Sequence, residues 1–178
     1  MKPLLKKSLL ICGLNFVTIL YAQSPSVTQY VNPFIGPGAV NGSSLSGNNF
    51  SGATTPFGMI QPSPDTREAP DWSVASGYNY NDKSIYGFSH THLSGTGVGD
   101  LFDISLMPYS RQRQYPISST FDHQQEIAKA GYYHVHLIED NINVELTATK
   151  HAGFQKYTYN KDSSACLLLD LDHSMPKG

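Results

Sequence analysis

Four short runs of alternating residues, separated by short polar turns, constrain the fold of this chain more than any other feature of its sequence. The runs are Tyr132–Ile138, Ile142–Thr149, Gly153–Tyr159 and Cys166–Leu171. Runs of this length with turn residues between them are typical of β-strands, and short connections favour antiparallel pairing of neighbours. We therefore predict a series of antiparallel strands in which each strand pairs with the next.

Alternation within these strands indicates that one face of the sheet is buried. The expected buried positions are Val135, Leu137, Ile142, Val144 and Leu146. Two more strands are expected at Ser84–Phe88 and Leu101–Met107, whereas Gln124–Ala130 has helix-favouring composition and is expected to end at Gly131. The pattern as a whole predicts an all-β protein, an antiparallel β-sandwich. Aromatic residues in the Gly-, Ser- and Asn-rich segment from Pro33 to Ser63 favour an ordered, functional loop over a slack linker.

The first 22 residues have the pattern of a secretory signal peptide. Three lysines precede an apolar run from Ser8 to Leu20, and Ala22 is a small residue at the expected cleavage site. The run is shorter than the roughly 20 apolar residues that a permanent membrane span needs. Lipidation at Cys12 is the less favoured alternative, since no small residues precede it. We expect export to the periplasm or beyond, without a membrane span.

Removal of the leader would leave one domain, residues 23–178, with a negative net charge. The leader holds three of the 12 basic residues and none of the 14 acidic ones, so the remaining charge is −5. No basic cluster is present that would attract a phosphate backbone, so nucleic acid is not an expected partner. Cys166 would be the one cysteine left, which predicts that the core and not a disulfide stabilises the domain.

The densest polar stretch runs from Gly87 to Asp100 and includes His90, His92 and Ser94. A His-x-His pair can begin a zinc site, but no third ligand has a suitable spacing. The glycines after Ser94 lack the spacing of a dinucleotide-binding loop, and the nucleophile motif of serine hydrolases is absent. Two interpretations stay open: a functional loop, or structural histidines that hold tight glycine turns in place.

A second candidate surface surrounds Trp72, the only tryptophan, which lies in a polar segment before Tyr78 and Tyr80. Aromatic rings in polar loops suit the apolar C–H faces of sugars. This surface is therefore a candidate carbohydrate platform, and the alternative is that Trp72 caps the core of the sandwich.

Two carboxylate pairs could serve as the acid and base of a glycosidase. They are Asp100 with Asp103, and Asp170 with Asp172, the latter on one face together with His173. Pairs of this kind are more often solvated or turn-forming, so the sequence does not assign them a catalytic role.

Several segments together resemble the amino-terminal domain of the family 92 glycoside hydrolases, the calcium-dependent exo-acting α-mannosidases of bacteria. The segments are Tyr30–Gly36, Gly47–Thr66, Ser76–Tyr80 and Gly87–Gly97. The last is close to a family signature, and the likeness extends from about Val27 to Asp172. Asn79 and Val98 depart from the family pattern, in which His and Cys are expected, and this leaves fine specificity in doubt.

The resemblance implies a β-sandwich of the galactose-mutarotase-like or supersandwich type, followed in the family by an (α/α)6 barrel. Family members act by inversion through a Glu acid and an Asp base that belong to the barrel, and a calcium ion helps to distort the terminal mannose. We therefore expect an incomplete enzyme without catalytic carboxylates or metal ligands of its own. We expect it to contribute part of the pocket for a mannose-containing glycan of N-glycan or mannan type. The residues expected there are Trp72, His90, His92 and Asp100.

The sequence leaves two other functions open. One is a stand-alone carbohydrate-binding sandwich that uses Trp72 and the Tyr78–Tyr80 surface. The other is a purely structural exported β domain.

Overall fold

A computed structural model describes residues 26–38, 47–69, 71–95, 100–110, 114–161 and 164–174. The predicted signal peptide lies outside these residues. The described part contains ten strands and three short 3₁₀ helices, and no α-helix. The strands are β1 (Ser63–Asp65), β2 (Ser84–Ile85), β3 (Gly87–Ser89), β4 (Ser105–Ser110), β5 (Ser119–Thr120), β6 (Ile127–Lys129), β7 (Tyr132–Leu137), β8 (Ile142–Ala148), β9 (Gly153–Thr158) and β10 (Ala165–Asp170), and the helices are η1 (Val27–Tyr30), η2 (Trp72–Val74) and η3 (His123–Gln125). In the ranges described, no helix has the length and apolar character that crossing a bilayer requires.

The first sheet has the strand order β6-β7-β8-β9, and every neighbouring pair in it is antiparallel. Val135 of β7 lies opposite Val144 of β8, so both side chains point to the same face. The predicted alternation is confirmed, because all five expected apolar positions are at most 1% exposed. The opposite face of these two strands is only half-buried.

The second sheet has the order β1-β3-β4-β10, and here one prediction of pairing is wrong. Strand β10 does not pair with β9 but crosses to β4, where Leu168 lies opposite Met107. This pairing turns both side chains toward the core. Met107 belongs to the core cluster, and Leu168 packs against it. The crossing places successive strands in different layers of the sandwich.

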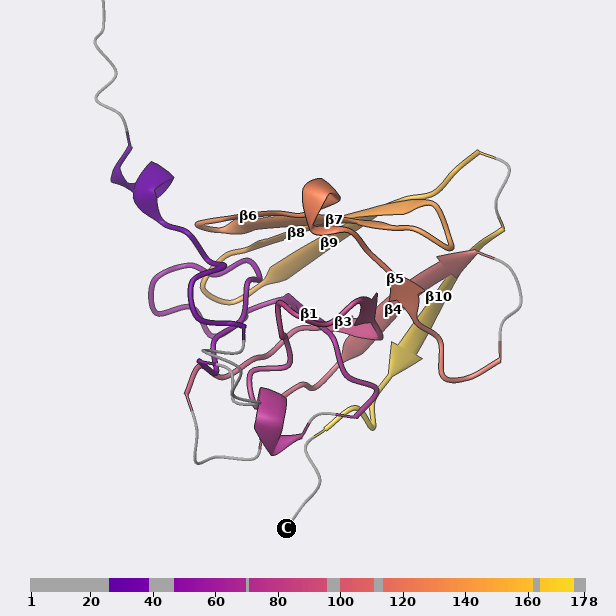
Figure 1. Cartoon of the computed structure of the whole chain (residues 1–178), viewed down its shortest axis with the longest axis horizontal. Helices are drawn as coiled ribbons and strands as arrows, with labels where there is room; N and C mark the ends of the chain where they lie inside the picture. The colour runs from indigo at the N-terminus through magenta and orange to yellow at the C-terminus, as the bar shows by residue number, and fades with distance from the viewer. Residues whose placement is uncertain are drawn as a thin grey trace, which may run out of the picture.

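Figure 1 shows the two sheets as layers, with β6–β9 above β1, β3, β4 and β10. The core lies between them, since one cluster of buried side chains joins Phe88 and Met107 of the second sheet to Val135 and Val144 of the first. The small pair β2·β5 adds Ile85 to the same cluster. The predicted all-β antiparallel sandwich is confirmed.

Three boundary predictions need correction. The helix expected at residues 124–130 is wrong, because β6 pairs with β7 and Gly131, at φ 76°, makes the hairpin turn between them. The strand expected at 84–88 is divided at Tyr86 into β2 and β3, which pair with different partners. The strand expected from Leu101 begins only at Ser105, because Leu101, Phe102 and Ile104 have φ values of 78°, 67° and 59°, which no strand allows.

Candidate functional site

The two histidines of the His-x-His segment lie in different surroundings. His90 is half-buried, and its Nδ1 lies 3.1 Å from Gln155 Nε2 of strand β9. His92 is buried, with 2% of its surface exposed. The two rings share no hydrogen-bond partner. In the described part of the chain, neither belongs to a group of three or more side chains that could hold a metal ion.

His92 joins the loop to strand β1. Its Nδ1 lies 2.8 Å from the Gln61 carbonyl oxygen, and its Nε2 lies 2.8 Å from Asp65 Oδ1. Ser89 donates to the other carboxylate oxygen of Asp65 through its hydroxyl, at 2.7 Å, and through its backbone N–H, at 2.9 Å. Although Ser, His and Asp meet here, Nε2 faces both Asp65 and Ser89, so the imidazole does not stand between a nucleophile and an orienting carboxylate. The arrangement is a buried anchor.

Trp72 lies in helix η2 and is 54% exposed. Asp71 caps this helix, accepting the backbone N–H groups of Ser73 at 2.7 Å and Val74 at 3.3 Å. Partial burial alone would raise the pKa of Asp71, but the hydrogen bonds from Ser73, with smaller contributions from Arg67 and Val74, leave that pKa below its ordinary value. The cap thus fixes the backbone that presents the indole.

Gly77 brings the Trp72 segment against the His92 anchor. Its φ is 83°, and a Cβ at this position would lie 2.6 Å from the ring of Phe102, 2.7 Å from Asp65 Oδ1 and 3.1 Å from His92 Cδ2. Only glycine allows this approach. The segments that carry Trp72 and His92 therefore meet at Gly77.

The other predicted aromatic and acidic residues are divided between core and surface. Asp100 is exposed and accepts the N–H of Leu101 at 2.8 Å, and the glycine run at 96–99 before it lies outside the described residues. Tyr80 is 37% exposed and stacks on His123 at a ring-centroid distance of 3.9 Å. Tyr78 is fully buried, so its assignment to an exposed sugar-binding surface is wrong.

The buried hydroxyl of Tyr78 is hydrogen-bonded within a polar network that the sequence did not reveal. The carboxylate of Glu126, 7% exposed, accepts the hydroxyls of Tyr78 at 2.9 Å and Tyr133 at 2.6 Å, and lies 2.5 Å from His123 Nδ1. Burial first, and the Glu126 charge second, raise the pKa of both tyrosines. The network was missed because the helix predicted at residues 124–130 would not place Glu126 in the core.

A cleft of about 440 Å³ lies between the described part of the long loop (Pro33–Ser63), Ser94 at the end of the His-x-His segment, and Lys129 and Ala130 at the end of β6. Its walls are joined by hydrogen bonds from Gln61 N to His90 O, at 2.9 Å, and from Gly95 N to Asn48 O, at 2.7 Å. The lining residues are mainly amides, hydroxyls and small apolar groups: Val31, Pro33, Asn49, Phe50, Gly52, Thr54, Thr55, Pro56, Gln61, Ser94, Lys129 and Ala130. We call it the loop cleft. Of the segment expected to be an ordered loop, residues 33–38 and 47–63 are described and 39–46 lie outside the described residues. The residues that line the cleft could not be named from composition.

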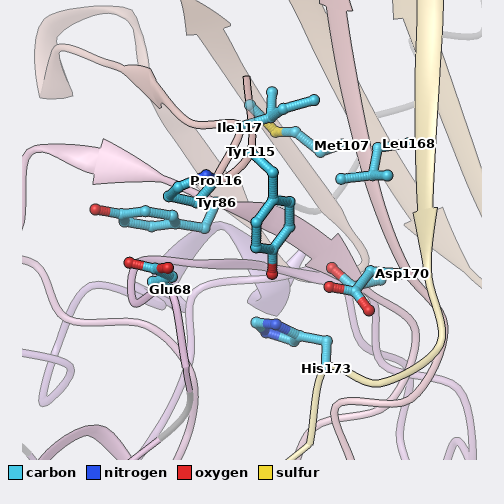
Figure 2. A pocket seen from close by; sticks show the side chains of 10 residues that line it. Glu68, Tyr86, Met107, Tyr115, Pro116, Ile117, Leu168, Asp170 and His173 are labelled. Atoms are coloured by element: carbon cyan, nitrogen blue, oxygen red, sulfur yellow. The ribbon is translucent and has the colours of Figure 1, made fainter. Parts of the chain in front are cut away.

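A second cleft lies where β10 ends, on the face of the second sheet to which Leu168 points, and Figure 2 shows its residues Glu68, Tyr115, Asp170 and His173. Its lining residues are Glu68, Ala69, Tyr115, Asp170, Asp172, His173 and Ser174. We call it the acidic cleft. The structure thus brings together Asp170, Asp172 and His173, as the alternation predicted, and adds Glu68 from the loop after β1.

In the ranges that the structure describes, no group of three or more His, Cys, Asp or Glu side chains is placed to hold a metal ion. Asp100 and Asp103 are both exposed. Calcium needs six to eight oxygen ligands, which these positions do not supply.

The described residues thus form an antiparallel β-sandwich with a cleft beside its long loop. The model of the glycosyl hydrolase family 92 N-terminal domain matches residues 30–178. The chain belongs to this family.

Known proteins agree with this assignment. A family GH92 α-mannosidase of Bacteroides thetaiotaomicron, solved with mannoimidazole, is similar at a TM-score of 0.75 and 36% identity, over 83% of this chain and 20% of that one. A GH92 inverting mannosidase from Bacteroides thetaiotaomicron VPI-5482 has a TM-score of 0.66 and 25% identity, over 80% and 19%. An uncharacterized secreted glycosidase of Arthroderma benhamiae is 26% identical over 162 residues, 85% of this chain and 20% of the relative. The chain spans about one fifth of these relatives' length.

Proposed function

We propose that this chain is the amino-terminal sandwich of an exported, inverting α-mannosidase and supplies part of the pocket for the terminal mannose of a glycan. The observation that carries the proposal is the loop cleft, whose walls come from the long loop and the His-x-His segment, within the matched family domain. Its amides and hydroxyls can bind sugar hydroxyls, and Phe50 and Pro56 offer apolar surface to the ring. N-glycans and mannans are the substrates that we propose.

We propose different roles for the four predicted site residues. Trp72 and Asp100 are exposed and His90 is half-buried, and we assign all three to sugar contacts outside the loop cleft, whose lining does not include them. The contacts of His92 support a positioning role, because the buried ring joins Gln61, which lines the loop cleft, to Asp65. Direct contact of His92 with the substrate stays a prediction.

Catalysis and calcium binding are proposed to belong to an (α/α)6 barrel that packs against this end of the sandwich. The loop beside the cleft supports such a partner. Phe57 is 99% exposed at a φ of 55°, and Met59 is 71% exposed. Exposed apolar side chains and a strained backbone are typical of a surface that meets another one. The expected export and the cleavage near Ala22 belong to the same proposal.

The test is a chimera in which residues 30–178 replace the matching segment of the 36%-identical α-mannosidase. His90→Ala should lower kcat/KM for an α-mannoside about fivefold or more, as the loss of a substrate hydrogen bond would. His136→Ala is the matched control, since His136 lies on the outer face of β7 and contacts Asn143. If both variants keep full kcat/KM, the proposed contact of His90 with the substrate is wrong.

One observation favours a second function, a stand-alone carbohydrate-binding module: Trp72 presents more than half of its surface on a capped helix. Calorimetric titration of the chain with mannosides separates the two functions. Binding that Trp72→Ala abolishes would support the module, and silence on every sugar would support a half-pocket that needs the barrel.

A further inference from the structure

The buried ring of His92 lies between two groups that accept hydrogen bonds. Its Nδ1 is 2.8 Å from the carbonyl oxygen of Gln61, and its Nε2 is 2.8 Å from Asp65 Oδ1. A backbone carbonyl has no proton to donate, so Nδ1 must carry one. The other oxygen of Asp65 accepts the N–H and the hydroxyl of Ser89, and bonds of this kind favour an ionised carboxylate. Nε2 must therefore donate as well, whereas a neutral imidazole has only one N–H.

His123 shows the same arrangement with its two nitrogens exchanged. Its Nδ1 is 2.5 Å from Glu126 Oε2, and its Nε2 is 2.7 Å from the carbonyl oxygen of Tyr80. Glu126 also accepts the hydroxyls of Tyr78 at 2.9 Å and Tyr133 at 2.6 Å, so this carboxylate too is surrounded by donors. Both nitrogens of His123 are therefore required to donate, as at His92.

Aromatic rings beside both histidines suit a positive charge. The ring of His123 stacks on that of Tyr80, with centroids 3.9 Å apart and an interplanar angle of 11°. The ring of His92 lies 5.1 Å from that of Phe50 and 5.3 Å from that of Phe102. A cation within about 6 Å of an aromatic ring is attracted by its face. Burial of the two carboxylates also strengthens their attraction for a neighbouring cation.

The two carbonyl groups connect these histidines to the two ends of the long loop. Gln61 lies near the end of the loop and lines the loop cleft. Tyr80 donates its backbone N–H to the carbonyl oxygen of Pro37, near the beginning of the loop, at 2.8 Å. Each histidine thus joins one end of the loop to a carboxylate that is buried in the sandwich.

We propose that His92 and His123 are imidazolium ions, each paired with a buried carboxylate, and that the two pairs position the ends of the long loop. A neutral ring at either site would set an unprotonated nitrogen against an acceptor at hydrogen-bond distance, which is costly in the interior. His173 also faces Asp65, but its Nε2 is 3.6 Å from Oδ2, beyond hydrogen-bond distance. The charges follow from these contacts and do not depend on the proposed function.

The experiment is NMR of the chain with ¹⁵N-labelled histidine at pH 8, where an ordinary histidine, with a pKa of about 6.5, is neutral. Correlation of ring protons with ring nitrogens shows which nitrogens carry a proton. We expect both nitrogens of His92 and of His123 to be protonated. His136, whose Nδ1 contacts the amide of Asn143, is the matched control and should have one unprotonated nitrogen.

Two variants test the pairs separately. Asp65→Asn should remove the proton from Nε2 of His92, while Nδ1 keeps its proton for the Gln61 carbonyl and His123 stays unchanged. Glu126→Gln should remove the proton from Nδ1 of His123 and leave His92 doubly protonated. Each variant thus controls for a general loss of structure in the other, and the wild-type spectrum decides the charges even if a variant does not fold.

Hydrogen exchange tests the positioning of the loop. Asp65→Asn should accelerate exchange of the Gln61 amide about threefold or more relative to the Tyr80 amide, and Glu126→Gln should do the reverse. An unprotonated nitrogen on His92 or His123 in the wild type would overturn the proposal, and so would a His92 that stays doubly protonated in Asp65→Asn. Equal acceleration of both amides by each variant would contradict the separate positioning of the two loop ends.

Discussion

Gly77 is the residue on which the approach of the Trp72 and His92 segments depends. Two separate costs would follow from a side chain there: the strain of a positive φ, and the overlap of a Cβ with Phe102 and Asp65. Sequence reasoning placed this glycine in a family motif, but its need for close backbone contact is visible only in three dimensions.

We expect Gly77→Ala to lower the free energy of unfolding by about 2–3 kcal/mol, the combined effect of strain and overpacking. Gly95→Ala is the matched control, because Gly95 also has a positive φ, 105°, but nothing lies within 4 Å of its Cβ position. Urea unfolding of both variants measures the difference. Equal losses would show that backbone strain alone, and not close packing against His92, explains the loss of stability in Gly77→Ala.

Asp71→Ala should cost about 1 kcal/mol at neutral pH, as the loss of a helix cap does. Because its folded pKa is below the ordinary 3.8, the Asp71 carboxylate stabilises the folded protein above that pH, and the effect is lost as the pH falls through the folded value. The difference in unfolding free energy between wild type and variant should therefore shrink in acid. A difference that is constant across this range would contradict the charged cap.

At the scale of elements, the sequence predicted β7 and β8 well, because each buries one face and the period of two is visible in Val135, Leu137 and their neighbours. The prediction failed where the secondary structure or the strand pairing depends on the partner in the folded protein. The sequence of strand β10 is as typical of a β-strand as those of the preceding strands, yet β10 pairs with β4 in the other sheet and not with β9. Segment 124–130 has helix formers in it, yet pairing with β7 makes its second half a strand. Of the candidate site, the segments were predictable, but which side chains are buried was not.

Glu126→Gln tests the network that holds η3 and β6 to Tyr78. We expect a loss of about 3 kcal/mol in unfolding free energy, since the buried carboxylate accepts two phenols and faces His123. Glu145→Gln, the same change at a half-buried carboxylate on the outer face of β8, should have a much smaller effect. Chemical denaturation measures both, and a loss no larger at Glu126 than at Glu145 would contradict the role of the network.

At the scale of the whole molecule, buried phenols predict a loss of stability in alkali. Burial raises the pKa of Tyr78, Tyr133 and Tyr157 above the ordinary value of 10.0. The unfolded chain therefore releases these protons first, so stability is retained below about pH 10 and falls as the pH rises beyond it. The urea midpoint should drop between pH 8 and pH 11, and Tyr157→Phe should reduce the drop. A midpoint independent of pH in this range would contradict the burial of these hydroxyls.

The central claim is that this sandwich supplies part of a mannoside pocket while the reacting groups lie outside it. The most direct measurement is hydrolysis of an aryl α-mannoside by the 178-residue chain in the presence of calcium. Because we propose that the acid, the base and the calcium ligands belong to the barrel, we predict a rate equal to that of buffer. Clear turnover that is lost on Asp100→Asn, Asp103→Asn, Asp170→Asn or Asp172→Asn would place catalysis within the sandwich and contradict the account.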